Sequence, residues 1–306
     1  MIGDVTFVII GRNEGLHLAR TFQSVLKITD KVIFVDSDST DNSVEIAKSF
    51  AIQKIIRVSS THGTAALSRS KGAEYVTTKY IQFLDGDETI SQGWLEKAIR
   101  KLDDNKKIAG VHGYKKVYKK NDKDFFILSD KKDWEPDYLQ GAVLINRAIY
   151  EYAGGMETRI FGEEERDLYV RVRSMGYQIW YIHELMASHY DWKEKKIKHL
   201  LFGSSSYTIW VPLFKAIKKR NFRAYLFVYR FLLPILLVDL VCIFSIVFGV
   251  ITFLIVGCFL QLIALVYCYK INRKGYFITW KIAILNFPRI FNVYRTKINT
   301  RVTEVT

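Results

Sequence analysis

Two aspartates separated by one glycine follow an apolar run at residues 80–84. They are Asp85 and Asp87 in the stretch "FLDGDET". Carboxylates at i and i+2 across a turn can both reach one divalent cation, and the glycine lets the backbone turn so that both acids face one point. Mg²⁺ and Mn²⁺ prefer oxygen ligands and commonly share them with substrate phosphates. The spacing therefore predicts a metal and phosphate site, with an aspartate cap of the next helix as the alternative.

The elements that must position these acids follow an alternating pattern over the first 90 residues. Strand-like runs alternate with segments whose apolar residues have helical spacing. The strand-like runs are "VTFVII" at 5–10, "KVIFVDSDST" at 31–40, "KIIRV" at 54–58 and "YIQFLDGD" at 80–87. This order predicts an α/β fold with a mostly parallel sheet and helices on both faces.

Polar residues follow three of the predicted strands at the point where each strand ends. They are Gly11-Arg12-Asn13-Glu14, Asp36-Ser37-Asp38 and Asp85-Gly86-Asp87. Because ligands of parallel sheets bind outside the carboxyl ends of the strands, we expect these groups to form one site.

Taken together, "VIIGRNEG", "VDSDSTDNS", "RSKG" and "FLDGDE" resemble the successive motifs of glycosyltransferase family 2, which has the Rossmann-like GT-A fold. The later stretches "LQGAVLINRAIYEYAGGMET" and "GEEERDLYVRVRSMGYQIWYI" resemble the acceptor-side segment of that family. The resemblance is collinear over roughly residues 4–190. It implies a GT-A catalytic domain at residues 1–190 that transfers a sugar from a nucleoside-diphosphate donor, most often with inversion.

The resemblance also implies roles for individual residues. Asp87 would bind Mg²⁺ or Mn²⁺, and Asp85 would contact the ribose or the metal. His189 is the candidate for a third metal ligand, with a structural histidine as the alternative. The residues implied in binding the nucleotide sugar are Gly11, Asn13, Glu14, Asp36, Asp38, Arg69, Asp85, Gln140 and Gly141. Among them, Asp36 would hold the base with Asp38 as second candidate, and Arg69 would lie near the diphosphate.

An inverting transfer also needs a carboxylate that removes the proton from the acceptor hydroxyl. Alignment of "GEEERDL" with the family pattern places this base at Glu165, with Glu164 as the alternative. This chain has Glu where the family usually has Asp, which leaves the register open between the two. Acids in the first turn of a helix also interact favourably with the helix dipole, so a capping role is the other interpretation.

The net charge of +14 is distributed unevenly along the 306 residues. Residues 1–189 carry as many acidic as basic residues, so the whole excess lies in 190–230 and 270–306. Between these two segments, residues 231–269 carry one charged residue, Asp239. A neutral N-terminal region argues against nucleic acid as a partner. Basic residues on both sides of an apolar stretch are typical of a membrane protein.

The apolar stretch is about twice as long as the roughly 20 residues that one helix needs to cross a bilayer. We therefore predict two transmembrane helices at 229–269 with a turn near Gly249, since a hairpin leaves both basic flanks on the cytoplasmic side. An acid inside such a span is costly. We expect Asp239 to lie near the interface, to pair with Arg230 or Arg223, or to be functional.

Residues 191–228 mix apolar and basic residues and predict interfacial amphipathic helices. Residues 270–306 predict an interfacial or cytoplasmic tail, with a third span at 276–294 as the alternative. These predictions place the protein in the cytoplasmic membrane as a multi-pass protein, with its catalytic domain in the cytoplasm. The acceptor would then be lipid-linked, such as a saccharide used in surface polysaccharide biosynthesis.

Two other functions are compatible with these features. The first is transfer of the sugar to polyprenyl phosphate itself. The second is a non-catalytic nucleotide-binding membrane scaffold, against which the full set of acids argues. Processive synthases of the family carry a Gln-x-x-Arg-Trp motif that does not occur in this sequence, which favours addition of a single sugar.

Overall fold

The computed structural model describes residues 2–61, 63–119, 125–128, 131–160, 164–192, 210–218, 222–247, 255–257, 259–263, 266 and 299–305. The chain divides into two compact units. The first consists of Met1–Glu194 and Val293–Thr306, and the second of Lys195–Asn292. The strands of the first unit are β1 (Val5–Gly11), β2 (Val32–Asp36), β3 (Lys54–Ser60), β4 (Tyr80–Asp85), β5 (Glu88–Ile90), β6 (Ile108–Lys119), β7 (Phe125–Leu128), β8 (Val143–Asn146), β9 (Gln178–Trp192) and β10 (Thr300–Glu304). Its helices are α1 (Leu18–Leu26), α2 (Ser43–Lys48), α3 (Ala65–Ala73), α4 (Trp94–Asp104), α5 (Arg147–Tyr152) and α6 (Glu164–Ser174).

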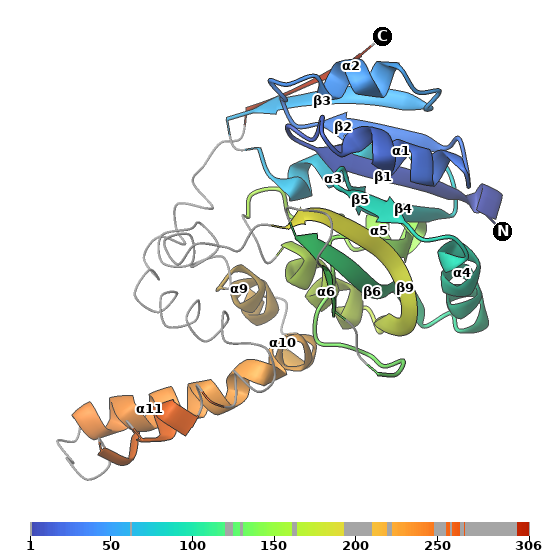
Figure 1. The fold of residues 1–306 in the computed structure, drawn as a ribbon. Helices are drawn as coiled ribbons and strands as arrows, with labels where there is room; N and C mark the ends of the chain where they lie inside the picture. Colours follow the sequence, from blue (N-terminus) through green and yellow to red (C-terminus); the bar gives the residue numbers. More distant parts are fainter. Residues whose placement is uncertain are drawn as a thin grey trace. The chain divides into compact units, whose positions relative to one another are not determined.

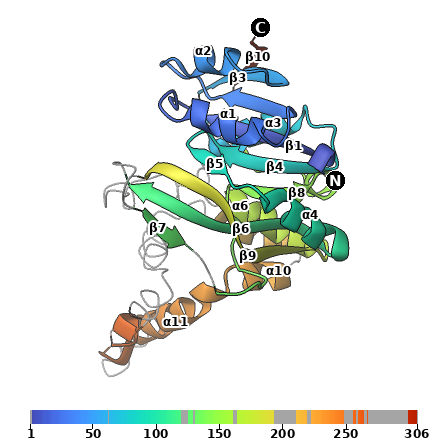
Figure 2. The same ribbon diagram turned by 45° about the vertical axis from the view of Figure 1, so that its right-hand side comes forward.

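The described strands form one sheet in the order β10-β3-β2-β1-β4-β8-β6-β9-β5, with β7 paired to β6 (Figure 1 and Figure 2). Strands β1 to β4 run parallel to one another, as the alternating pattern predicts. In the register, Gly11 of β1 lies opposite Asp36 of β2, and Ile10 lies opposite Asp85 of β4. The ends of β2 and β4 therefore flank the end of β1 at the same edge of the sheet.

Beyond β4 the sheet is mixed, because antiparallel strands stand among parallel ones: β6 and β9 run parallel to each other. Strand β8 runs antiparallel to β4 and to β6, and β5 runs antiparallel to β9. Among the described residues, β6, β7 and β8 follow one another without an intervening helix, and strands joined in this way have no requirement to be parallel. The sheet is therefore mixed, with a parallel half that carries the three polar strand ends.

Helices cover both faces of this part of the sheet, which is why β1, β2 and β4 are buried and mostly apolar along their length. On one face, Phe22 and Trp94 of α1 and α4 belong to the same hydrophobic core as Phe7 and Phe34. On the opposite face, α3 approaches the sheet at Gly72, where a Cβ would lie 2.4 Å from Val8 and 2.9 Å from Val35. The close approach of α3 positions Arg69, one turn earlier, over the sheet.

The C-terminal residues add a strand that the sequence analysis did not predict. Strand β10 pairs antiparallel with β3, so Thr303 lies opposite Arg57, and Figure 2 shows it at the edge of the sheet beside β3. Lys54 of β3 contacts Glu304 of β10 at 2.7 Å. This segment falls within the predicted tail at 270–306, whose end instead belongs to the sheet of the first unit.

The second unit contains α9 (Trp210–Lys218), α10 (Phe222–Val228) and α11 (Leu233–Val247). Among the described residues, no single helix is long and apolar enough to cross a membrane. Two helical segments, Phe222–Val228 and Arg230–Cys242, meet the length and composition requirement together, with a bend of 71° between them. The predicted turn near Gly249 and the alternative span at 276–294 lie outside the described residues.

Asp239 of α11 has a partner that the sequence analysis did not propose. Its Oδ1 accepts a hydrogen bond of 2.7 Å from Gln261 Nε2. A Cβ on Gly257 would lie 2.7 Å from the sulfur of Cys242, so the backbone at Gly257 packs closely against α11. Gln261 and Gly257 thus lie on the side of their segment that meets α11.

Candidate active site

The turn that carries the two aspartates is held against the loop after β1. The Gly86 amide donates to the Ile10 carbonyl at 2.8 Å, and its carbonyl accepts from the Thr21 hydroxyl at 2.8 Å. A Cβ on Gly86 would lie 3.2 Å from the Ile10 carbonyl oxygen and 3.2 Å from the Glu14 side chain. A side chain at this position would therefore require the Ile10 carbonyl or the Glu14 side chain to shift by a few tenths of an ångström.

Asp87 contacts His189, which the β5 and β9 pairing brings next to it. His189 Nε2 lies 2.9 Å from Asp87 Oδ2, and the Tyr190 amide donates to the Asp87 carbonyl at 2.9 Å. Burial alone lowers the pKa of His189, but the hydrogen bond and negative charge of Asp87 outweigh it, so this pKa lies above its ordinary value. The structure thus brings together two of the three predicted metal ligands.

Asp85, the third predicted ligand, is engaged by Arg69 of α3. Arg69 Nη2 lies 2.8 Å from Asp85 Oδ1, while Nη1 lies 3.0 Å from Glu165 Oε1. Burial raises the pKa of Asp85, but the positive charges of Arg69 and Lys115 and the hydrogen bond from Arg69 together outweigh burial and leave the pKa below its usual value. One guanidinium therefore joins the aspartate turn to the predicted base.

Gly141 provides the room for this guanidinium. A Cβ there would lie 2.3 Å from Arg69 Nη2, 2.9 Å from Arg69 Cζ and 3.2 Å from Glu165 Oε1. Sequence analysis placed Gln140 and Gly141 among the residues that bind the nucleotide sugar. Gln140 donates to the Gly113 carbonyl at 3.4 Å, and its buried Oε1 has no hydrogen-bond partner in the part of the chain that the structure describes.

The two candidate bases differ in their surroundings at the start of α6. Glu164 is 6% exposed, whereas the Glu165 side chain is 20% exposed and contacts Arg69. The next acid, Asp167, pairs with Arg171 within the helix at 2.7 Å. Glu165 is thus the acid of this group that combines solvent access with a contact to the aspartate turn.

Sequence reasoning missed a buried ion pair beside the aspartates. Lys115 of β6 contacts Glu88, whose side chain is 1% exposed. Burial lowers the pKa of Lys115, but the charges of Glu88 and Asp85 outweigh it and raise the pKa above its ordinary value. Because Glu88 directly follows Asp87 in the sequence, its position indicates that it belongs to the site. The sequence of β6 contains no motif that singles out Lys115.

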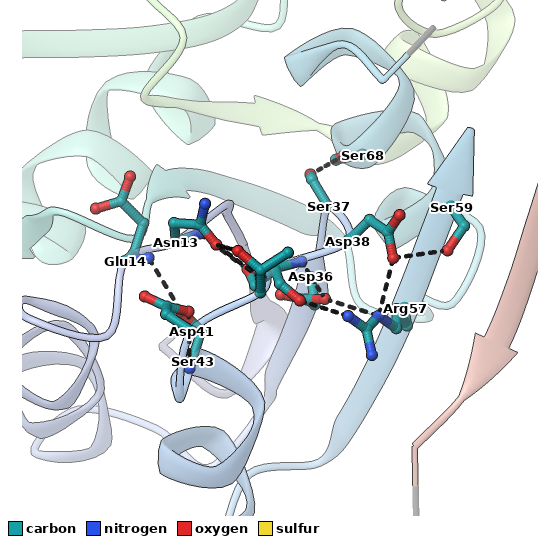
Figure 3. Close-up of polar contacts among 12 residues, drawn as sticks. Asn13, Glu14, Asp36, Ser37, Asp38, Asp41, Ser43, Arg57, Ser59 and Ser68 are labelled. Atoms are coloured by element: carbon teal, nitrogen blue, oxygen red, sulfur yellow. Dashed lines mark hydrogen bonds and ion pairs between the residues drawn. The ribbon is translucent and has the colours of Figure 1, made fainter. Parts of the chain in front are cut away.

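The loops after β1 and β2 are tied to each other by short polar side chains (Figure 3). The backbone amide of Asn13 donates to Ser39 Oγ at 2.9 Å, and the backbone amide of Thr40 donates to the side-chain Oδ1 of Asn13 at 2.8 Å. The amides of Glu14 and Gly15 donate to Ser43 Oγ and to Asp41 Oδ2, both at 3.0 Å. These bonds hold the predicted nucleotide-binding loop in one conformation.

The two aspartates after β2 have opposite exposures. The Asp36 side chain is fully buried, and its Oδ2 accepts from the Ser39 amide at 3.1 Å. The Asp38 side chain is 53% exposed, and its Oδ1 accepts from Ser59 Oγ at 3.0 Å. Arg57 of β3 lies between them, with Nε 3.3 Å from a carboxylate oxygen of each (Figure 3). No motif in the sequence indicated that Arg57 would lie at this site.

The predicted residues thus gather in two groups along one edge of the sheet. Asp85, Asp87, His189, Arg69 and Glu165 form the group after β4. Asn13, Glu14, Asp36 and Asp38 form the group after β1 and β2. Since neighbouring strands lie about 4.8 Å apart, the ends of β2 and β4 are about 10 Å apart across β1. A nucleoside diphosphate can span that distance.

Comparison with known proteins connects this arrangement to a family. Residues 6–154 match the sequence profile of "Glycosyl transferase family 2". The minor teichoic acid biosynthesis protein GgaB of Bacillus subtilis is 30% identical over 102 residues, which cover 31% of this chain and 11% of that protein. Glycosyltransferase GlyG of Streptococcus pneumoniae is 26% identical over 141 residues, which cover 44% of this chain and 46% of that protein. Each of these two matches thus spans less than half of the relative's length.

Solved structures show the same fold at low sequence identity. S. aureus TarS 1-349 in complex with UDP-GlcNAc has a TM-score of 0.57 at 11% identity, over 68% of this chain and 65% of that one. GalNAc-T7 with UDP, GalNAc and Mn²⁺ has a TM-score of 0.52 at 14% identity, over 61% and 43%. The fold is therefore GT-A-like, and residues 6–154 are similar to the domain of glycosyltransferase family 2.

Proposed function

We propose that this protein transfers a single sugar, with inversion, from a nucleoside-diphosphate sugar to an acceptor hydroxyl. The observation that carries the proposal is the Arg69 bridge between Asp85 and Glu165. A guanidinium at that point can hydrogen-bond a diphosphate while it orients the base. Two proteins of the same fold favour a UDP-sugar donor: the TarS structure contains UDP-GlcNAc, and the GalNAc-T7 structure contains UDP.

Each residue would have a distinct task in this reaction. Glu165 accepts the proton of the acceptor hydroxyl while the oxygen of that hydroxyl attacks the anomeric carbon. The bond from the anomeric carbon to the diphosphate breaks in the same step. Arg69 keeps the Glu165 carboxylate directed toward the aspartate turn and donates to the departing diphosphate. The loop tied by Asn13 and Ser39 binds the nucleoside.

Asp87 and His189 would hold Mg²⁺ or Mn²⁺. His189 Nε2 and Asp87 Oδ2 lie 2.9 Å apart, and the described residues contain no group of three His, Cys, Asp or Glu side chains suited to a metal. A two-residue set fits these cations, because they commonly complete their coordination with substrate phosphates and water. When bound, the cation neutralises charge on the diphosphate.

Hydrolysis of a panel of sugar nucleotides tests this proposal. We expect slow release of UDP from one donor in the presence of Mn²⁺, because water can replace the acceptor. Asp87→Ala should abolish both this release and the Mn²⁺-dependent rise in UDP affinity, whereas Asp104→Ala, on the exposed end of α4, should leave both unchanged.

Two other results would identify the alternative functions. Nucleotide binding without turnover on any donor or lipid acceptor would indicate a non-catalytic nucleotide-binding scaffold. Transfer to bare polyprenyl phosphate would identify the alternative acceptor.

We further propose that the second unit associates with the cytoplasmic membrane and that the acceptor is lipid-linked. Apolar side chains of its helices are widely exposed, with Leu237 at 64%, Leu240 at 61% and Phe259 at 62%. Residues 231–269 carry one charge, and basic segments stand on both sides of them. GgaB, a teichoic acid biosynthesis protein, supports an acceptor from surface polymer synthesis.

A flotation assay with vesicles of phosphatidylglycerol and phosphatidylethanolamine tests this association. The parent should float with the vesicles. Leu237→Glu combined with Leu240→Glu should shift most of the protein to the bottom fraction, since each buried charge in a bilayer costs about 2–3 kcal/mol. Leu16→Glu is the matched control, because Leu16 is 82% exposed in the first unit. Equal flotation of the parent and the double variant would contradict the proposal.

A further inference from the structure

Two positive charges of the protein itself lie at the aspartate turn. Asp85 contacts Arg69 of α3 at 2.8 Å, and Glu88, the residue after Asp87, contacts Lys115 of β6. Both cations are largely shielded from solvent, since the Arg69 side chain is 4% exposed and the Lys115 side chain is 15% exposed. Charges in such surroundings interact more strongly than charges in bulk water, because the effective dielectric constant is lower. A divalent cation at this turn therefore meets two like charges.

Lys115 reaches Glu88 across strand β9, which lies between β6 and β5 in the sheet. In the register, Lys115 lies opposite Ala187, whose single methyl group leaves room for the lysine to cross the strand. Val117 and Glu88 both lie opposite His189. Because alternate residues of a strand share a face, Lys115, Glu88 and His189 lie on one face of the sheet. The lysine is thus on the same face as the histidine that contacts the aspartate turn.

Glu88 holds the ammonium group of Lys115 at this place. The Glu88 side chain is 1% exposed, and its Oε2 has no hydrogen-bond partner in the part of the chain that the structure describes. Removal of one partner from a buried ion pair is strongly unfavourable, so each side chain keeps the other in place. Against the effect of burial, the charges of Arg69 and Lys115 hold the pKa of Asp85 below its usual value. Lys115 therefore acts on the aspartates as well as on Glu88.

We infer that Lys115 sets the affinity of the aspartate turn for a divalent cation and weakens cation binding before the donor arrives. This inference rests on the proposed function, in which Asp87 and His189 bind Mg²⁺ or Mn²⁺. Lys115 repels a cation at the turn, and the negative charge of Glu88 offsets part of that repulsion. A donor diphosphate adds negative charge and oxygen ligands, so the cation binds mainly together with the donor.

Binding of Mn²⁺ in the absence of nucleotide tests the inference. Electron paramagnetic resonance measures free Mn²⁺ and so gives the dissociation constant, at about pH 8 so that carboxylates are ionised. Lys115→Met should bind Mn²⁺ about tenfold more tightly than the parent, because a like charge is removed. Glu88→Gln should bind it about tenfold more weakly, because the charge of Lys115 is no longer offset.

Two further variants and a control isolate the charge of the lysine. The combined variant Lys115→Met with Glu88→Gln removes both charges, and its Mn²⁺ affinity should return close to that of the parent. Lys115→Arg keeps the charge and should bind as the parent does. Lys116→Met is the matched control, since the next residue of β6 faces the other side of the sheet and lies 3.8 Å from the centroid of the Phe125 ring.

A purely structural role of the ion pair predicts a different pattern, because loss of either charge would then weaken Mn²⁺ binding. Weaker or unchanged binding in Lys115→Met would overturn the inference. Equal affinities in Glu88→Gln and in the combined variant would do so too, and this comparison decides if urea denaturation shows that Lys115→Met is unfolded. A parent whose UDP affinity does not rise with Mn²⁺ would instead contradict the metal site of the proposed function.

Discussion

Replacement of Glu165 by glutamine is expected to lower kcat for donor hydrolysis by about 10²–10⁴-fold, with nucleotide affinity retained. Glutamine has nearly the same shape as glutamate but cannot accept a proton from water or from an acceptor hydroxyl. Arg69 would keep its contact with Asp85, so the aspartate turn should remain in place. The measurement is the rate of UDP release under saturating donor, beside calorimetric binding of UDP.

Glu164→Gln is the matched control for this experiment, because it makes the same chemical change one residue earlier in α6. Glu164 is 6% exposed, which leaves little of it accessible to an acceptor. We expect its variant to retain most of the hydrolysis rate. The opposite pattern, with Glu164→Gln inactive and Glu165→Gln active, would assign the base to Glu164. Loss of UDP affinity in Glu165→Gln would show that this residue acts on binding.

Replacement of Gly141 by alanine is expected to lower activity by about 100-fold, because it displaces the guanidinium that joins the two halves of the site. The new Cβ would lie 2.3 Å from Arg69 Nη2, a separation that requires the guanidinium to move by about 1 Å or more. Overpacking of this kind should also lower the free energy of unfolding by about 1–3 kcal/mol. Donor hydrolysis and urea denaturation measure the two effects.

A double-mutant cycle separates the effect on Arg69 from a general loss of packing. If the alanine acts through Arg69, the combined variant Gly141→Ala and Arg69→Met should be no less active than Arg69→Met alone. Gly3→Ala is the matched control, since a Cβ at Gly3 meets no atom within 4 Å. Additive losses in the double variant would mean that Gly141 contributes to activity independently of Arg69.

The sequence predicted the parallel half of the fold because its signals are local. Apolar runs of strand length alternate with helically spaced residues, and the four parallel strands form where these runs occur. The rest of the sheet, in which parallel and antiparallel pairs are mixed, was predicted less well, since no helix separates β6, β7 and β8 in the described residues. Strand β10 was missed because a short polar segment becomes a strand through its pairing with β3.

The sequence by itself determined which acids stand at the strand ends, since each of Asp36, Asp85 and Asp87 follows an apolar run in its own segment. The tertiary structure alone decided what each acid contacts. Arg69 and Glu165 are 96 residues apart in the chain and meet only because α3 packs over the sheet and Gly141 leaves room. Likewise, β3 brings Arg57 within 3.3 Å of both the buried Asp36 and the exposed Asp38. Residue type and spacing specify the available charges, whereas burial and pairing depend on contacts between segments distant in the chain.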